Sequence, residues 1–101
     1  MQPTKKYTVI TGASSGIGYE TAKAFASRGK NLIVAARRTE NLERLKHEIL
    51  ERHSALDIVI RTVDLSTPEG VYQFYSELKD FRLETWVNNA GFGNKSEAKR
   101  S

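Results

Sequence analysis

A glycine-bearing turn between a strand-like and a helix-like segment constrains the fold of this chain more than any other feature of its sequence. Residues 11–18 read T-G-A-S-S-G-I-G. They follow Lys6–Thr11, a short run rich in residues that favour β-strands. They lead into a stretch with apolar residues at helical spacing, whose expected inward stripe is Ile17, Ala22, Phe25 and Ala26. Strand, turn and helix in this order predict the first unit of a parallel α/β fold.

A second strand and a second helix are expected next. Gly29 fits the left-handed position that ends the first helix. Asn31–Ala36 is an almost uninterrupted apolar run, typical of a strand covered on both faces. Thr39 is expected to cap the second helix, whose inward stripe would be Leu42, Leu45, Ile49 and Leu50.

The third strand, the third helix and the fourth strand complete the pattern. Residues 57–64 read as the third strand and residues 83–88 as the fourth. Between them, Ser66 or Thr67 is expected to cap a helix that has Pro68 in its first turn. The inward stripe of this helix would be Val71, Phe74, Tyr75 and Leu78.

The regular alternation of strands and helices predicts the fold class. We expect an α/β, Rossmann-like fold: a partial doubly wound parallel sheet of about four strands in the order 3-2-1-4, with helices on both faces. Residues 1–93 would form this partial domain. Residues 94–101 contain no large apolar side chain and are expected to be a polar C-terminal tail.

The first turn has the composition of a phosphate-binding loop. Gly12 would allow a tight turn, Gly16 a close approach of the backbone to a pyrophosphate, and Gly18 close packing of helix and strand. Backbone N–H groups at the helix start, around Ile17, would hold the anion together with the helix dipole. The remaining candidate donors are the hydroxyl groups of Ser14 and Ser15.

Two more motifs stand in register with this turn. Asn88-Asn89-Ala90-Gly91 follows the fourth strand, and Asp64-Leu65 follows the third. Together with T-G-x-x-x-G-x-G they give residues 5–93 a resemblance to the short-chain dehydrogenase/reductase family. The resemblance implies that Asp64 and Leu65 border the adenine of a dinucleotide. It also implies that Asn89, Ala90 and Gly91 lie beside the cofactor while tying strands together.

The end of the second strand indicates which cofactor would bind. An NAD site places an acidic residue about 20 residues beyond the glycine turn, where it bonds the ribose 2′-hydroxyl. This chain has Arg37 and Arg38 there instead. Guanidinium groups suit a 2′-phosphate, so NADP(H) is favoured over NAD(H). Arg37 is the better candidate, and Arg38 could instead stack on adenine or face water.

The residues that carry out the family's hydride transfer are not expected in this chain. The resemblance implies a Tyr and a Lys spaced Y-x-x-x-K, with a Ser and an Asn. Tyr19 with Lys23 and Tyr75 with Lys79 have this spacing, but both pairs precede the fourth strand, so we expect neither to be catalytic. The chain would be the NADP(H)-binding segment of a short-chain oxidoreductase and inactive alone. The alternatives are a non-catalytic NADP(H)-binding sensor module, or a truncated remnant without autonomous function that associates through an exposed fourth strand at Trp86 and Val87.

Composition excludes several other classes of function. There is no cysteine, and His47 and His53 stand without a third ligand, so no metal site is expected. The net charge is +4, but basic and acidic residues are interleaved, so nucleic acid is not an expected partner. No stretch approaches about 20 apolar residues and the first residues lack the apolar core of a secretory signal, so a cytoplasmic location without membrane contact is expected.

Overall fold

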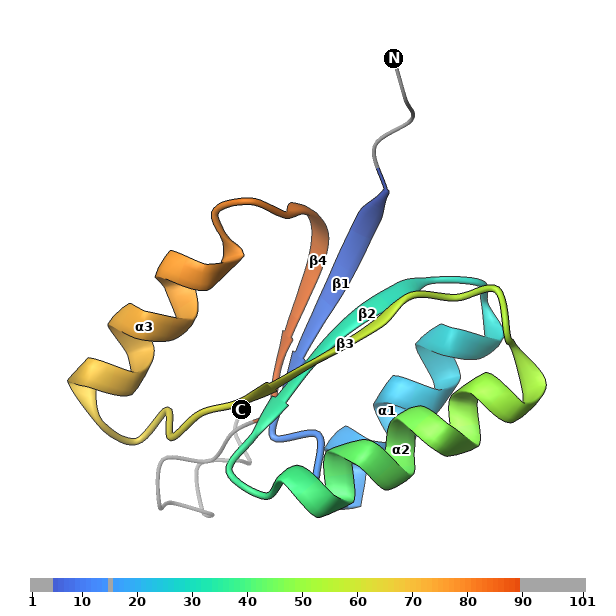
Figure 1. Cartoon of the computed structure of the whole chain (residues 1–101), viewed down its shortest axis with the longest axis horizontal. Coiled ribbons are helices and arrows are strands. Elements are labelled where there is room, and N and C mark those ends of the chain that lie inside the picture. The colour runs from blue at the N-terminus through green and yellow to red at the C-terminus, as the bar shows by residue number, and fades with distance from the viewer. Residues whose placement is uncertain (1–4, 15, 90–101) are drawn as a thin grey trace.

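A computed structural model describes residues 5–14 and 16–89 of the chain. This part consists of parallel strands and the helices between them (Figure 1). In chain order the elements are β1 (Lys6–Thr11), α1 (Gly16–Ser27), β2 (Asn31–Ala36), α2 (Thr39–Arg52), β3 (Ile58–Thr62), α3 (Pro68–Leu78) and β4 (Arg82–Asn88). The four strands form one parallel sheet in the order β3-β2-β1-β4. The predicted strand order and the α/β class are confirmed.

Helices cover both faces of the sheet, as predicted. Helices α1 and α2 lie side by side on one face, and α3 is the one described helix on the other (Figure 1). Because successive strand residues point to opposite faces, β1 sends Ile10 toward α1 and α2 and Val9 toward α3. Both central strands are buried on both faces, which explains the uninterrupted apolar run of β2.

The inward stripes of two helices differ from the prediction at one position each. Ile17 is 77% exposed, and Gly18 takes the inward place beside Ala22 and Ala26. In α3, Tyr75 is 58% exposed, and Gly70 is buried in line with Phe74 and Leu78. In both helices the first turn lies so close to the backbone of the turn before it that only a glycine fits there.

The helix ends confirm two predictions and overturn a third. Gly29 has a φ of 82°, the left-handed conformation expected after α1. The side chain of Thr67 accepts a hydrogen bond from the N–H of Gly70, which makes it the cap of α3. Thr39 was wrongly expected to cap α2, because it already lies inside the helix and its hydroxyl pairs with the Thr62 hydroxyl at 2.6 Å.

The edge strands are shorter or more exposed than the central ones. Strand β3 is shorter than the predicted 57–64, and β4 begins one residue before the predicted 83–88. In the described part of the chain β4 is an outer strand, and Trp86 is 38% exposed although it packs edge-on against Phe74 and Tyr75. The other residue expected at this edge, Val87, packs against the core under α1 and α2.

Side chains tie the sheet together at its amino end. The Tyr7 hydroxyl donates to the carboxylate of Asp57, across β2. This hydrogen bond, with burial, raises the pKa of Tyr7 to about 12. The backbone N–H of Asp57 donates to Asn31 Oδ1 at 2.9 Å. These hydrogen bonds join β1, β2 and the residue before β3 at the amino end of the sheet.

Candidate nucleotide-binding site

All four strands are parallel, so their carboxyl ends meet at one edge of the sheet. In open α/β sheets ligands bind outside this edge. Each strand is followed there by one of the predicted motifs: the glycine turn after β1, the arginines after β2, Asp64 after β3 and Asn89 after β4. The fold therefore brings all four motifs to the same edge, although they are far apart in sequence.

The turn after β1 has a backbone that only glycine adopts easily. Gly12 and Gly16 have φ values of 65° and 60°. A Cβ on Gly18 would lie 2.1 Å from the carbonyl oxygen of Gly12, so α1 starts directly against the turn. Ala13 fixes the turn to the neighbouring strand by donating its N–H to Ala35 O at 3.2 Å. The positive end of the α1 dipole is thus held at the edge of the sheet.

The side chains of this turn leave its outer surface open. Ser14 is half-buried and makes no hydrogen bond with the described residues, and Ile17 is exposed. A Cβ on Gly16 would meet nothing within 4 Å, so the space in front of its backbone is open. The predicted Ser15 lies outside the described residues.

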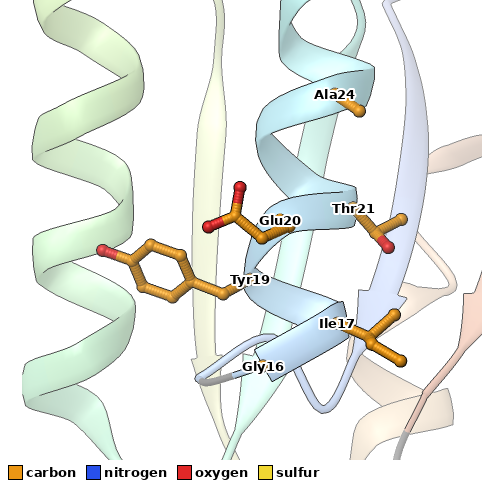
Figure 2. Close-up of a pocket in the computed structure, with 6 residues that line it drawn as sticks. All are labelled: Gly16, Ile17, Tyr19, Glu20, Thr21 and Ala24. Atoms are coloured by element: carbon orange, nitrogen blue, oxygen red, sulfur yellow. The ribbon is translucent and has the colours of Figure 1, made fainter.

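An open hollow of about 580 Å³ runs along the solvent side of α1 rather than across the strand ends (Figure 2). Tyr19 points toward α2, whereas Ile17 and Thr21 point to the opposite side of the helix (Figure 2). The hollow shares only Gly16 and Ile17 with the predicted phosphate turn. We therefore place the candidate site at the strand ends, where the predicted motifs meet, and not in this hollow.

After β2, the two arginines are exposed at the point where α2 begins. Arg38 is the residue before the helix and makes no capping hydrogen bond through its side chain. Arg37 lies near enough to Asp64 for its charge to act on that carboxyl group. Neither guanidinium is in an ion pair among the described residues, so both are open to an outside anion.

The side chain of Asp64, after β3, is held by Ser66, which the sequence indicated only as a possible helix cap. Its Oδ1 accepts hydrogen bonds from the Ser66 hydroxyl at 2.6 Å and from the Ser66 N–H at 3.0 Å. These bonds, with a smaller contribution from the charge of Arg37, lower the pKa of the Asp64 carboxyl. The next residue, Leu65, is partly buried against the core under α3. The D-x-S spacing, typical of a local turn, was the available signal for Ser66.

The end of β4 is fastened to the end of β1. The Thr11 hydroxyl donates to Asn88 Oδ1 at 2.8 Å and accepts the N–H of Asn89 at 3.0 Å. The side-chain nitrogen of Asn89, Nδ2, is buried and has no hydrogen-bond partner among the described residues. Thr11 was not predicted as a site residue, because a strand-end threonine carries no signal of its partner. The predicted Ala90 and Gly91 lie outside the described residues.

Tyr19, Lys23 and Tyr75, from the two Y-x-x-x-K pairs, contact neighbouring elements of the fold. The Tyr19 hydroxyl donates to Glu48 at 3.0 Å, and the Lys23 ammonium lies 3.5 Å from the same carboxylate, so both join α1 to α2. Burial and the bond to Glu48 raise the pKa of Tyr19, which is the wrong direction for a tyrosine that must give up its proton. Tyr75 packs on Trp86.

The described residues contain neither a cluster of metal ligands nor a helix that could span a membrane. Over residues 5–14 and 16–89, no three His, Asp or Glu side chains are grouped as metal ligands. Within those same ranges, no helix has the length and apolar character needed to cross a bilayer.

Comparison with known proteins points to one family. The sequence profile of the short chain dehydrogenase family matches residues 6–101. An uncharacterised oxidoreductase of Mycobacterium tuberculosis is 37% identical over 92 residues, which are 89% of this chain and 36% of that protein.

Solved structures give the same result. A short-chain dehydrogenase from Sphingobium yanoikuyae in complex with NADPH superposes with a TM-score of 0.78 at 33% identity, over 85% of this chain and 34% of that one. L-sorbose reductase from Gluconobacter frateurii, complexed with NADPH and L-sorbose, gives 0.77 at 32% identity, over 97% of this chain and 38% of the other. This chain spans little more than a third of the length of each of these relatives.

Proposed function

Since this chain belongs to the short-chain dehydrogenase family, we propose that it is the NADP(H)-binding part of an oxidoreductase that moves hydride between nicotinamide and a carbonyl or alcohol carbon. The observation that carries the proposal is the meeting of the glycine turn and Arg37 at one edge of the sheet. A dinucleotide lying across this edge would have its pyrophosphate at the turn and its adenosine toward β2 and β3.

Each predicted residue has a role in this proposal. The first turn would bind the phosphates through Gly12, Ser14, Ser15, Gly16, Ile17 and Gly18. Arg37 and Arg38 would bind the ribose 2′-phosphate, and Asp64 and Leu65 would border the adenine. The nicotinamide ribose would lie beside Asn89, Ala90 and Gly91. The open face of the turn and the two exposed guanidinium groups support these assignments.

The choice of NADP(H) over NAD(H) depends on charge. A 2′-phosphate is a dianion at neutral pH, and a guanidinium group binds it with paired, charge-assisted hydrogen bonds. Arg37 has no ion-pair partner among the described residues, so binding the phosphate would break no existing salt bridge. Two of the related structures contain NADPH, which is consistent with this choice.

The proposal separates binding from catalysis. When bound, the nicotinamide would supply the hydride, and the residues of this chain would orient and hold the cofactor. We predict that the 101-residue chain alone does not turn over a substrate. Its cytoplasmic location and its self-association through β4 stay predictions from the sequence.

The test is a fluorescence titration of the purified chain with NADPH and with NADH. We expect NADPH to bind at least about tenfold more tightly, the size of a charge-assisted hydrogen bond. Arg37→Asp should remove the preference, because a carboxylate repels the phosphate and can bond the 2′-hydroxyl of NADH. Arg82→Asp is the matched control, because Arg82 is also exposed but lies at the amino end of β4. Its NADPH preference should be unchanged.

Two results would overturn the proposal. One is the absence of saturable binding of either cofactor to a chain whose circular dichroism spectrum shows folded α/β structure. The other is an equal loss of NADPH preference in Arg37→Asp and Arg82→Asp, because that would reduce the effect to net charge.

A further inference from the structure

Asp64 has one carboxylate oxygen engaged and one free. Both hydrogen bonds from Ser66 go to Oδ1, and Oδ2 makes no hydrogen bond or ion pair with the described residues. The Ser66 hydroxyl makes no other hydrogen bond within the described part of the chain, so this carboxylate is its one partner there. An exposed aspartate would otherwise rotate freely, so a contact of this kind selects one orientation.

The backbone that carries Asp64 is fixed by a separate set of contacts. Thr67 Oγ1 donates to the carbonyl oxygen of Asp64 at 3.2 Å and accepts the N–H of Gly70 at 3.0 Å. A Cβ on Gly70 would lie 1.8 Å from the same carbonyl oxygen. Thr67 and Gly70 therefore fix the main chain, and Ser66 fixes the side chain.

We propose that Ser66 is a positioning residue, which holds the Asp64 carboxylate so that its free oxygen accepts a hydrogen bond from the 6-amino group of an adenine ring. The inference rests on the proposed function, which lays the adenosine of the cofactor at this end of β3. A carboxylate oxygen can only accept hydrogen bonds. It therefore favours a purine with an amino group at position 6 and repels one with an oxygen there.

The consequence is selectivity for the base, which can be measured apart from overall affinity. Hypoxanthine has a carbonyl oxygen in place of the adenine amino group and is otherwise similar in shape. The probes are NADPH and its deamino analogue, reduced nicotinamide hypoxanthine dinucleotide phosphate. The readout is the ratio of their dissociation constants, which a general loss of folded protein leaves unchanged.

Substitutions in this turn can test whether Ser66 orients the Asp64 carboxylate or only stabilises the turn. The wild-type chain should prefer NADPH by about tenfold. Ser66→Ala should lower this ratio severalfold. Ser66→Thr keeps the hydroxyl, so it should keep the ratio near the wild-type value. Asp64→Asn should bring the ratio to one or below, since Ser66 would hold its amide oxygen and leave the amide NH2, which only donates, toward the base. Thr67→Ala is the matched control in the same turn, and it should destabilise α3 without changing the ratio.

A pH profile provides a second readout. Hydrogen bonds from Ser66 keep the pKa of the Asp64 carboxyl low. In Ser66→Ala the acidic limb of NADPH binding should therefore move to higher pH, and in Ser66→Thr it should not.

The outcomes distinguish this inference from the proposed function. If NADPH binds and Arg37→Asp weakens it, but the ratio is near one in the wild type or is unaffected by Ser66→Ala, only the role of Ser66 is overturned. An equal fall of the ratio in Thr67→Ala overturns it as well, because the effect would then come from the backbone. If the wild-type chain binds neither probe, the proposed function and this inference both fail.

Discussion

The turns after β1 and β3 each place a glycine third in the following helix, under a backbone carbonyl six residues earlier. Gly18 lies against Gly12 in the first turn, and Gly70 lies against Asp64 in the other. The rest of each turn differs. The first relies on the left-handed backbone of Gly12 and Gly16, whereas the second relies on side chains that bond the main chain.

The two turns differ in how many of their polar groups are already hydrogen-bonded within the chain. In the turn after β3, Ser66 and Thr67 bond the polar groups around Asp64, and the N–H of Gly70 at the start of α3 is capped. In the turn after β1, the Ser14 hydroxyl has no partner among the described residues, and a Cβ on Gly16 would meet nothing within 4 Å. The N–H groups at the start of a helix suit an anion where the space in front of them is open. Two turns with the same packing contact can therefore have different functions.

The largest expected effect comes from the contact that both turns share. Gly18→Ala and Gly70→Ala each put a Cβ within 2.1 Å or less of a backbone oxygen, so the helix must move away from the strand. We expect each to lower the free energy of unfolding by at least about 3 kcal/mol, a large part of what a small domain has. Urea denaturation followed by circular dichroism would measure it. A variant with the wild-type midpoint would show that the two turns do not depend on this close contact.

A smaller effect should separate the turns by their function. Gly16→Ala and Gly29→Ala both place Ala at positive φ with open space around the new Cβ. Each should cost about 1 to 2 kcal/mol of stability, from backbone strain alone. Only Gly16→Ala should also weaken NADPH binding, by about tenfold, because its methyl group would occupy the space that a phosphate needs. Equal NADPH affinity in the two variants would argue against the turn after β1 as the phosphate site.

Sequence patterns predicted the arrangement of elements well because it depends on features that the sequence shows locally. The alternation of apolar runs with helical patterns was enough for the strand order, and two of the three helix ends assigned from sequence, at Gly29 and Thr67, were right. The two errors in the inward stripes of the helices have one physical cause. Ile17 and Tyr75 were assigned to the core by helical spacing, but Gly18 and Gly70 take those places because the helices approach the strands too closely for a side chain.

The candidate site was predicted by position and not by its internal bonds. The fold places the residues that follow the four strands at one edge, which is a consequence of parallel strands. The contacts of Thr11 with Asn88 and Asn89 join residues more than 70 positions apart. No local pattern predicts such pairs. The bond from Ser66 to Asp64 is local, but the choice of Ser66 over Thr67 as the partner of the carboxylate depends on the path of the turn.

The smallest expected effect is a difference in how the two turns respond to acid. The turn after β1 has no titratable side chain between Thr11 and Gly18, whereas the turn after β3 contains Asp64, whose pKa in the folded chain is lowered by Ser66. A lowered folded pKa contributes stability above the ordinary aspartate value of about 3.9, and this contribution is lost as the pH falls through the lower folded value.

Asp64→Asn should therefore make the free energy of unfolding fall less steeply below about pH 4 than in the wild type. The asparagine oxygen can still accept the hydrogen bonds from Ser66, so the turn should keep its shape while losing its titration. Ser14→Ala is the control in the other turn, and it should leave the pH dependence as it is. Urea denaturation from pH 3 to pH 6 would compare the three chains. The same slope for Asp64→Asn and the wild type would mean that the Asp64–Ser66 contact does not persist in solution, and the two turns would then differ less than their hydrogen bonds indicate.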